Sequence, residues 1–542
     1  MGFKNLTSDI VFDKLIGFGM FPESLDPIFN SSGFRYLVLS DSVNKAFKIT
    51  KDMVFFPVNY KLTRNNNAPR YLQIPNPLVY LNLCSLIKEN WENISSLILN
   101  DYDSYEDTSM ITLKDNDEER LIFLRNYNIE VETDEFRLLI NRGNSNSNNI
   151  ILDKQFLKKY IVVSDIANFF SSIYTHSIPW AIVGKDIAKN NSNNKKLWYN
   201  KLDKAIRMIK NNETNGISIG PDTSNLISEI ILSRIDNILI KKGYNFIRYI
   251  DDYKCYCDNK QKAETFIQDL SHELEKYNLT INTKKTFIKL LPQELNDLVY
   301  SKLNNYNIPE KVDYENIDSL LNYLDYAVDL SNKSDEYSPF KFAIKSLNKI
   351  NSIDDESYIK ILKYILNITF IHPYLIDSLD SFIEKGYSSI AYAHKITEQV
   401  EKFLNGIIKE HLKFHRSDTL TWSIYLAIKY SIKINNFTNI RDNLIKENDT
   451  IPILLALNYS YINNISLFSF NKYIGKIDER ENWILIYEYY RLTKKYANGY
   501  NSYSPIEYLD FYNYLLNNNI SFFNLIILDR LNGKKFQTDI SF

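Results

Sequence analysis

The sequence predicts an α+β fold in which a mixed α/β half is followed by an all-helical half. Two observations lead to this prediction. Strand-like and helix-like segments alternate up to about residue 295, and beyond about residue 305 the apolar residues recur mostly at helical spacing. We therefore expect one domain over residues 1–300 and a helical domain over residues 301–542, with the boundary between 295 and 312. A chain of 542 residues is long enough for both.

The composition is that of an ordinary soluble protein. Hydrophobic residues make up 44% and charged residues 24%, and the net charge of −2 gives no global sign of a nucleic-acid partner. No apolar run reaches the ~18 residues that a membrane span needs, and the N-terminus lacks a secretory signal. Cys84, Cys255 and Cys257 are too few for a disulfide framework or a zinc site. We expect a cytoplasmic protein with no membrane partner.

The first half contains strands and helices that the apolar spacing and β-branched runs identify. One of these strands ends on a carboxylate, Asp165. In chain order, the expected elements are a helix around Leu78–Ile87, a strand at Tyr160–Asp165, a helix within 217–240, a strand pair within 245–257, a helix at 263–277 and a strand at Leu279–Phe287.

The second half is expected to contain helices separated by polar loops. Paired helices without strands suggest an irregular α-solenoid. The expected helices lie near 317–330, 356–370, 388–408, 418–434, 451–470, 481–497 and 505–530.

Two adjacent carboxylates mark the candidate active site. Asp251 and Asp252 lie between apolar, strand-prone runs, which predicts a hairpin with both acids at its turn. Like charges a few Å apart repel, and a divalent cation removes that cost. Hard oxygen ligands suit Mg²⁺, with Mn²⁺ as an alternative, and such an ion shares its shell with substrate phosphates. The pair therefore indicates phosphoryl or nucleotidyl transfer.

Asp165 supplies a third carboxylate. On an adjacent strand of one sheet it would lie beside Asp251, and the two would bridge a pair of metal ions. Asp252 would complete the shell, and the carbonyl of Ile166 could add one more oxygen. Phe170 would lie beneath the sugar of an incoming nucleotide, where its ring would clash with a 2′-hydroxyl.

A glycine-containing loop and a lysine are further candidates. Gly216 and Gly220 precede the helix within 217–240 and allow a ligand to approach the backbone closely. Thr223 or Ser224 could cap the N-terminus of that helix. Lys285 could protonate or stabilise a departing pyrophosphate.

Four segments stand out in chain order: Asp165 with Phe169-Phe170, Gly216–Ser224, Tyr249-Ile250-Asp251-Asp252 and Asn282-x-x-Lys285-Thr286. Taken in order, they resemble palm motifs A, B, C and D of reverse transcriptases. Further stretches are Asp165–Trp180, with its Tyr174-Thr175-His176-Ser177-Ile178-Pro179-Trp180 core, Gly184-Lys185, Arg70–Asn76 and Gly386-Tyr387-Ser388-Ser389. These stretches are similar, more narrowly, to the abortive-infection reverse transcriptases of phage defence.

The resemblance implies a bacterial protein with a reverse-transcriptase palm and fingers followed by a HEAT-like helical-repeat domain. It implies a DNA polymerase that takes dNTPs, works without a template and primes from a hydroxyl of its own side chains. The single-stranded DNA product would then be covalently attached to the protein. The resemblance also implies a homo-oligomer, either a trimer or a hexamer.

One departure from ordinary reverse transcriptases favours untemplated synthesis. Their motif B usually has Pro-Gln before its second glycine, where this chain has Ser218-Ile219. Ile219 cannot donate the hydrogen bond by which that glutamine helps to hold the template and nascent pair. Arg70 is the candidate fingers contact to the nucleotide triphosphate, with Lys61 and Arg64 as rivals.

Two basic features are open to a structural and a functional interpretation. The segment Lys189–Lys210 has seven basic residues against the single acid Asp203, so it is either a solvated helix face or a phosphate-binding track. His176 lies near Asp165 in sequence and could act as an acid or base, but a hydrogen-bonded structural histidine is the expected interpretation.

Two alternative functions also remain. The enzyme could be a templated reverse transcriptase that copies a dedicated non-coding RNA, in which case the product would have a defined sequence. The chain could instead be a non-enzymatic assembly or nucleic-acid-binding protein that uses the palm as a scaffold. The presence of all three carboxylates argues against that last possibility, since a scaffold has no need of converging charges.

Overall fold

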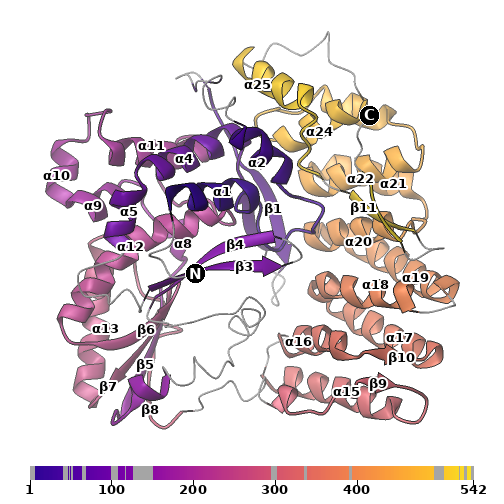
Figure 1. The fold of residues 1–542 in the computed structure, drawn as a ribbon, viewed down its shortest axis with the longest axis horizontal. Helices are drawn as coiled ribbons and strands as arrows, with labels where there is room; N and C mark the ends of the chain where they lie inside the picture. Colours follow the sequence, from indigo (N-terminus) through magenta and orange to yellow (C-terminus); the bar gives the residue numbers. More distant parts are fainter. Residues whose placement is uncertain are drawn as a thin grey trace.

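The two halves of the chain lie side by side in a computed structural model (Figure 1). The mixed α/β half is on the left of this view, and a column of helices is on the right. The α+β content that the sequence predicts is confirmed. The structure describes residues 7–40, 47, 49, 53–63, 69–98, 108–115, 118–125, 151–293, 302–334, 338–389, 393–493, 506–523, 525–529 and 534–538.

A six-stranded sheet is the centre of the first half. Its strand order is β3-β4-β6-β7-β5-β8, and neighbouring strands are antiparallel. Its strands are β3 (Thr108–Asp115), β4 (Glu118–Arg125), β5 (Tyr160–Asp165), β6 (Asn245–Tyr249), β7 (Asp252–Cys257) and β8 (Phe287–Leu290).

Helices pack on this sheet and extend beyond it. The long helix α12 contacts β4 and α13, and α13 contacts β5 and β7. Asn259 accepts a hydrogen bond from the amide of Lys262 and so begins α13, as N-cap residues do. The helices of this half are α1 (Ser8–Phe18), α2 (Ser32–Leu39), α4 (Pro77–Glu89), α5 (Trp91–Ile98), α8 (Phe169–Ser172), α9 (Ser177–Val183), α10 (Lys185–Asn190), α11 (Trp198–Ile209), α12 (Asp222–Lys241) and α13 (Lys260–Glu275).

The second half is a column of helices that rises from α15 to α25 (Figure 1). α20 is buried along its whole length and contacts α19 and α22. The elements are α15 (Ile317–Ser334), α16 (Ser338–Ser346), α17 (Asp355–Ile371), α18 (Asp380–Ser389), α19 (Ala393–His411), α20 (Ser417–Lys429), α21 (Phe437–Glu447), α22 (Thr450–Ile462), α23 (Phe468–Ile474), α24 (Trp483–Thr493) and α25 (Ile506–Asn517), with the 3-10 turns η2 (Leu347–Lys349), η3 (Pro373–Ser378) and η4 (Leu412–Phe414). That these helices form HEAT-like repeats stays a prediction.

Three sequence-based expectations about strands are wrong. The second half was expected to lack strands, but β9 (Lys311–Val312) pairs with β10 (Ser352–Ile353). The helix expected over 505–530 ends at Asn517, and β11 (Leu525–Asp529) pairs with β12 (Lys534–Thr538). The strand expected at Leu279–Phe287 begins only at Phe287, because the chain first turns at residues 282–286.

A separate hairpin joins the two halves. β1 (Val58–Thr63) and β2 (Pro69–Ile74) form a two-stranded antiparallel sheet, and β1 contacts both α20 and α22 of the helical half. The backbone amide of Thr63 and its hydroxyl each donate to the buried carboxylate of Asp418, at 2.8 Å.

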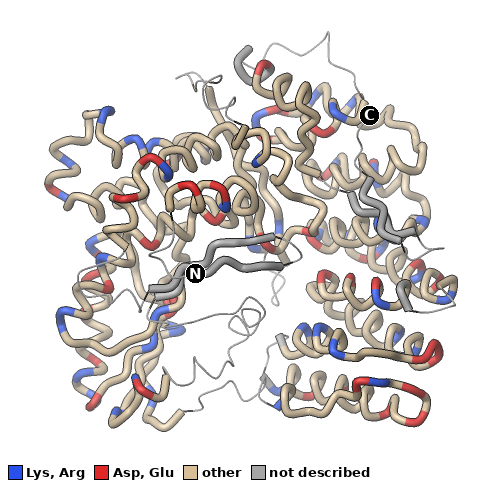
Figure 2. The backbone as a smooth tube through the Cα atoms, viewed as in Figure 1, with Lys and Arg blue, Asp and Glu red and all other residues tan. Residues whose placement is uncertain are grey.

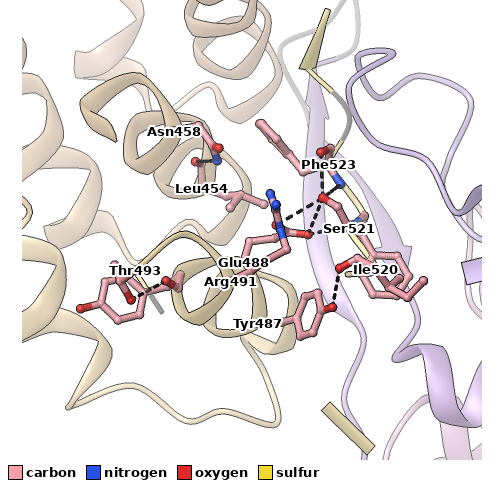
Figure 3. A network of polar contacts seen from close by, with 11 residues as sticks. Leu454, Asn458, Tyr487, Glu488, Arg491, Thr493, Ile520, Ser521 and Phe523 are labelled. Atoms are coloured by element: carbon pink, nitrogen blue, oxygen red, sulfur yellow. Dashed lines mark hydrogen bonds and ion pairs between the residues drawn. The ribbon is translucent and has the colours of Figure 1, made fainter. Parts of the chain in front are cut away.

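The C-terminal part of the helical half also contacts the N-terminal part of the chain. Phe29 forms an isolated antiparallel bridge with Phe523, and the amide of Asn30 donates to the carbonyl of Phe522 at 3.2 Å. The buried carboxylate of Glu488 accepts from the amide of Phe522 at 2.8 Å. It also pairs with Arg491, as Figure 3 shows. These bonds hold the segment after α25 against the first helices.

Candidate active site at the end of β5 and β7

The β6–β7 hairpin carries two of the three predicted carboxylates. Tyr249 pairs with Asp252, so Ile250 and Asp251 form a two-residue turn between the strands. Ile250 has φ 51°, at a position where type II′ hairpin turns normally have glycine. Such a conformation at a β-branched residue costs about 1–3 kcal/mol, and other contacts must stabilise it. The predicted hairpin is confirmed, with Asp251 in its turn and Asp252 as the first residue of β7.

The third carboxylate lies directly across the next pair of strands. Asp165 is the register partner of Asp252 in the β5–β7 ladder, and opposite residues in such a ladder have Cβ atoms about 5 Å apart. The amide of Ile166 donates to the carbonyl of Asp251 at 3.3 Å. The structure therefore brings Asp165, Ile166, Asp251 and Asp252 together at one edge of the sheet.

The charges at this edge oppose one another. Burial, reinforced by the neighbouring Asp252 and Asp165 carboxylates, raises the pKa of Asp251 to about 6. Lys285 forms an ion pair with Asp165, and the hydrogen bond between them raises the pKa of the Lys285 ammonium. Lys285 thus stays protonated and offsets part of the negative charge.

The turn that carries Lys285 is fixed to the end of β5. The amide of Asn282 donates to the carbonyl of Asp165 at 2.7 Å, and the hydroxyls of Ser164 and Thr286 lie 2.9 Å apart. The Thr286 hydroxyl also donates to the carbonyl of Asn282 at 2.9 Å, which closes the turn. Two separate anchors therefore hold the predicted lysine beside the carboxylates.

The loop before α12 is bonded to the segment that follows Asp165. The amide of Gly216 donates to the carbonyl of Ile173, and the amide of Ile217 donates to the carbonyl of Phe170, both at 2.9 Å. Phe170 is half-buried, and its ring centroid lies 5.1 Å from that of the buried Phe169. Phe170 is thus bonded through its backbone to the loop before α12, and its place beneath a nucleotide sugar stays a prediction.

Gly220 occupies a position that no other residue fits easily. It has φ 129°, and a Cβ atom there would lie 2.7 Å from the side chain of Pro22. The preceding carbonyl, that of Ile219, accepts from the amide of Gln73 on β2 at 2.7 Å. The loop is thereby tied to the β1–β2 hairpin.

The predicted capping of α12 is wrong. No side chain caps its N-terminus, and Pro221 holds the N-cap position. The hydroxyl of Ser224 instead donates to the carbonyl of Ser218 at 2.5 Å, so it fixes the loop rather than the helix end.

The candidate fingers residues lie on the hairpin rather than at the carboxylates. Arg70 is half-buried on β2, three residues before the strand position that bonds to the glycine loop. Its rival Lys61 pairs with Asp449 of the helical half at 3.5 Å, and Arg64 lies outside the described residues. A role for Arg70 in binding a triphosphate stays a prediction.

The carboxylates were also predicted to bind metal. The described residues contain no group of three or more His, Cys, Asp and Glu side chains already placed to hold an ion. The donor set nevertheless fits a hard cation, because the ionised form of Asp251 is disfavoured by burial and by its acidic neighbours.

The structure decides between the two interpretations for His176 but not for the basic segment Lys189–Lys210. His176 hydrogen bonds through Nδ1 to the buried Asp203 at 3.0 Å, which is the structural interpretation. Arg207 pairs with the same carboxylate, and Lys210 donates to the carbonyl of Gly216 at 3.3 Å. Other lysines of the segment are exposed on α10, on α11 and between them, and basic and acidic residues are interspersed over both halves (Figure 2). The phosphate-binding track stays a prediction.

Sequence reasoning missed the ionic residues beneath the hairpin. Arg248 is fully buried and pairs with Glu229 and Asp236 of α12. The available signal was the presence of charged residues at positions where the apolar pattern of a strand or a buried helix requires none.

Comparisons with known proteins place the site in a family context. Residues 114–328 match the family model described as reverse transcriptase (RNA-dependent DNA polymerase). No curated protein matches the chain. Among solved structures, apo telomerase from Candida tropicalis is 10% identical, with 88% of this chain and 76% of that chain covered and a TM-score of 0.30. The same telomerase with a fragment of telomeric RNA is 12% identical, with 82% and 71% covered and a TM-score of 0.27.

These structural similarities are too low to bear on the fold, so the family match carries the assignment. It covers β5, α12, the β6–β7 hairpin and the turn at Lys285. The chain thus carries a reverse-transcriptase domain and is a nucleotidyltransferase of that type.

Proposed function

We propose that this reverse-transcriptase domain makes DNA in bacterial antiphage defence, without copying a template and by extending a hydroxyl of the protein itself. The observation that carries the proposal is the convergence of Asp165, Asp251 and Asp252 at one edge of the sheet. The abortive-infection type follows from the resemblance of Asp165–Trp180 to that class.

Asp165, Asp251, Asp252 and the carbonyl of Ile166 are the groups that would hold Mg²⁺ or Mn²⁺. Two such metal ions, when bound, would activate the attacking hydroxyl and stabilise the leaving pyrophosphate. The carboxylates themselves fix the position at which the triphosphate lies. Lys285, protonated and anchored beside Asp165, would neutralise charge on the departing pyrophosphate.

The loop and the aromatic residue supply the substrate preference in this proposal. Phe170 would lie under the sugar and exclude a 2′-hydroxyl, so that dNTPs are the substrates. Gly220 would let the backbone approach the nucleotide, and Arg70 would contact the triphosphate. The roles of Phe170 and Gly220 are supported by their match to the palm motifs, and that of Arg70 by the resemblance of Arg70–Asn76.

A templated reaction is the second candidate, and the description of the matched family as RNA-dependent DNA polymerases favours it. Ile219 favours the untemplated reaction, since its side chain has no hydrogen-bonding group to offer a template. The sequence of the product separates the two: a defined or repeated sequence supports templating, and composition without order supports untemplated synthesis.

The first prediction tests the enzyme directly. Purified protein given dNTPs and Mg²⁺ without nucleic acid should gain covalently attached single-stranded DNA, seen as a radiolabelled shift on a denaturing gel. The double variant Asp251→Asn/Asp252→Asn should lose at least about 10³-fold of this activity, because two metal ligands are removed.

The control for this variant is Asp153→Asn/Asp186→Asn, which removes two exposed acids outside the site and should label as the wild type does. Labelling of the Asp251→Asn/Asp252→Asn protein at the wild-type level would refute the active-site assignment. Mass spectrometry of the DNA-linked peptide would identify the priming residue, and light scattering would give the oligomeric state, which we propose to be a trimer or hexamer.

A further inference from the structure

A buried ionic cluster lies directly beneath the turn that carries Asp251. The guanidinium of Arg248 is 1% exposed and makes a two-pronged contact with the carboxylate of Glu229, each bond being 2.8 Å long. Its Nε donates to Asp236 at 2.9 Å. The hydroxyl of Tyr253 donates to the other oxygen of Asp236 at 2.8 Å, so the acid is bonded from both strands of the hairpin.

One bond of this cluster reaches the turn itself. Nη1 of Arg248 also donates to the backbone carbonyl of Ile250, at 2.8 Å. Ile250 is the residue with positive φ, a conformation that a β-branched side chain disfavours. Arg248 therefore holds the backbone of the strained residue that directly precedes Asp251.

The cluster also connects two parts of the site. Glu229 and Asp236 are seven residues apart on α12, so they lie on one face of that helix, two turns from each other. α12 begins directly after the loop that contains Gly220. Arg248 thus joins the turn that carries Asp251 to α12, the helix that begins after the loop containing Gly220.

The energetics favour a role in geometry over one in stability. Removing an arginine and two acids from water is costly, and apolar residues of similar size would fill the space at a smaller desolvation penalty. The fork of the guanidinium, by contrast, fixes direction as well as distance. A buried group that satisfies a carbonyl in an unfavourable backbone conformation is suited to holding that conformation.

We propose that Arg248 is a positioning residue for nucleotidyl transfer. By donating to the carbonyl of Ile250, it keeps the turn in the conformation that presents Asp251 and Asp252 opposite Asp165. The inference rests on the proposed function of those carboxylates, and its test includes a readout that does not depend on DNA synthesis.

The test compares two variants of the same cluster. Arg248→Lys keeps a positive charge beside Glu229 and Asp236 but cannot form the fork and reach the Ile250 carbonyl at once. We expect its kcat to fall about 10²-fold, as for a catalytic group displaced by about 1 Å, with KM for dNTP within about threefold of wild type. Tyr253→Phe removes a bond to Asp236 and leaves the turn contact, and its kcat should stay within about threefold.

A second substitution tests whether Arg248 acts through the turn at Ile250. Glycine adopts positive φ without strain, so Ile250→Gly lessens the need for the bond from Arg248. The double variant Arg248→Lys/Ile250→Gly should therefore recover at least about tenfold in kcat over Arg248→Lys alone. A double variant no more active than Arg248→Lys would contradict action through the turn.

Hydrogen–deuterium exchange supplies the readout that is independent of catalysis. The amide of Ile166 donates to Asp251, so it should exchange about tenfold faster in Arg248→Lys and unchanged in Tyr253→Phe. Equal protection in Arg248→Lys and wild type would overturn the positioning role. A wild-type protein that makes no DNA would be a failure of the proposed function alone. Exchange that is faster in Arg248→Lys than in wild type supports this inference whatever the activity.

Discussion

The carboxylate of Asp251 is ionised at neutral pH only at a cost to the folded state. Its pKa is raised to about 6 by burial and by Asp252 and Asp165, which means that the folded protein holds that proton more tightly than the unfolded chain does. The contribution to stability is therefore present at low pH and is lost as the pH rises through 6. A residue that destabilises its own fold in this way is typical of a functional site.

Asp251→Asn should consequently stabilise the metal-free protein at pH 7. Removing the charge should add about 1–2 kcal/mol to the free energy of unfolding, a value reduced from the full shift because solvent screens part of the repulsion. Thermal unfolding in excess chelator is the measurement. Asp258→Asn, at the far end of β7, breaks an ion pair with Lys158 and should not raise the melting temperature. A lower melting temperature for Asp251→Asn than for wild type would contradict the repulsion.

His411 gives a second residue-scale prediction, now in pH. Burial, with Arg416 nearby, lowers the pKa of His411 to about 4, and within the described part of the chain neither ring nitrogen has a hydrogen-bond partner. Since the folded pKa is below the usual value near 6.5, the stability it contributes is present above pH 6.5 and is lost as the pH falls toward 4.

The variant His411→Met keeps the volume and removes the titration. Its melting temperature should fall less than that of wild type between pH 7 and pH 5. The exposed His272, changed to Gln, is the control and should leave the pH dependence as it is. Parallel curves for wild type and His411→Met would show that the buried imidazole has no part in acid sensitivity.

At the scale of elements, the glycine loop offers the clearest contrast within the chain. Gly220 and Gly243 both have positive φ, but a Cβ atom at Gly220 would meet Pro22, whereas at Gly243 no atom of the described residues lies within 4 Å. Gly243→Ala measures the backbone strain alone, about 1 kcal/mol. Gly220→Ala should destabilise by about 2–3 kcal/mol and lower kcat/KM at least about tenfold, because the loop must move from β2. Equal effects of the two substitutions on unfolding and on DNA synthesis would be the contrary result.

The elements also show what could be predicted from the sequence and what could not. β5 and the β6–β7 hairpin follow from β-branched and aromatic runs that end at carboxylates, and α13 follows from its apolar spacing. Residues 279–286 have strand-like composition, yet only Ile281 forms a bridge, because the chain must turn to anchor Asn282 to the end of β5. Local pattern does not contain that tertiary constraint.

Some residues of the candidate site could likewise be predicted from the sequence, and one could not. Asp165, Asp251, Asp252 and Lys285 could be found because each lies in a short motif. Arg248 could not, because its partners are on α12, and only the folded chain shows that its guanidinium turns back to the carbonyl of Ile250.

In the whole molecule, the β1–β2 hairpin connects the helical half to the reverse-transcriptase site. Thr63 of β1 donates twice to Asp418 of α20, and Gln73 of β2 donates to Ile219 of the glycine loop. A change at the helical half can therefore reach the loop through a single pair of strands.

Asp418→Ala should test this connection. It leaves two donors of Thr63 without their acceptor, one of them a backbone amide, which should cost about 2–3 kcal/mol of stability, and it should raise KM for dNTP by loosening the hairpin. Chemical denaturation and steady-state kinetics are the measurements. Asp329→Ala removes an exposed pair with Lys333 on α15 and should change neither by much. An unchanged KM in Asp418→Ala would separate the helical half from substrate binding.

The junction of Phe29 and Asn30 with Phe522 and Phe523 has a consequence for how the protein is made. The rings of Phe29 and Phe523 meet edge to face at 5.4 Å, although 494 positions separate the two residues in sequence. During translation, the opening helices emerge from the ribosome long before the aromatic residues that cover them, and contacts so distant in sequence form slowly. Until synthesis reaches those residues, the contact between Phe29 and Phe523 is missing, so the segment between α1 and α2 gains this part of its packing only after the helical half has been made.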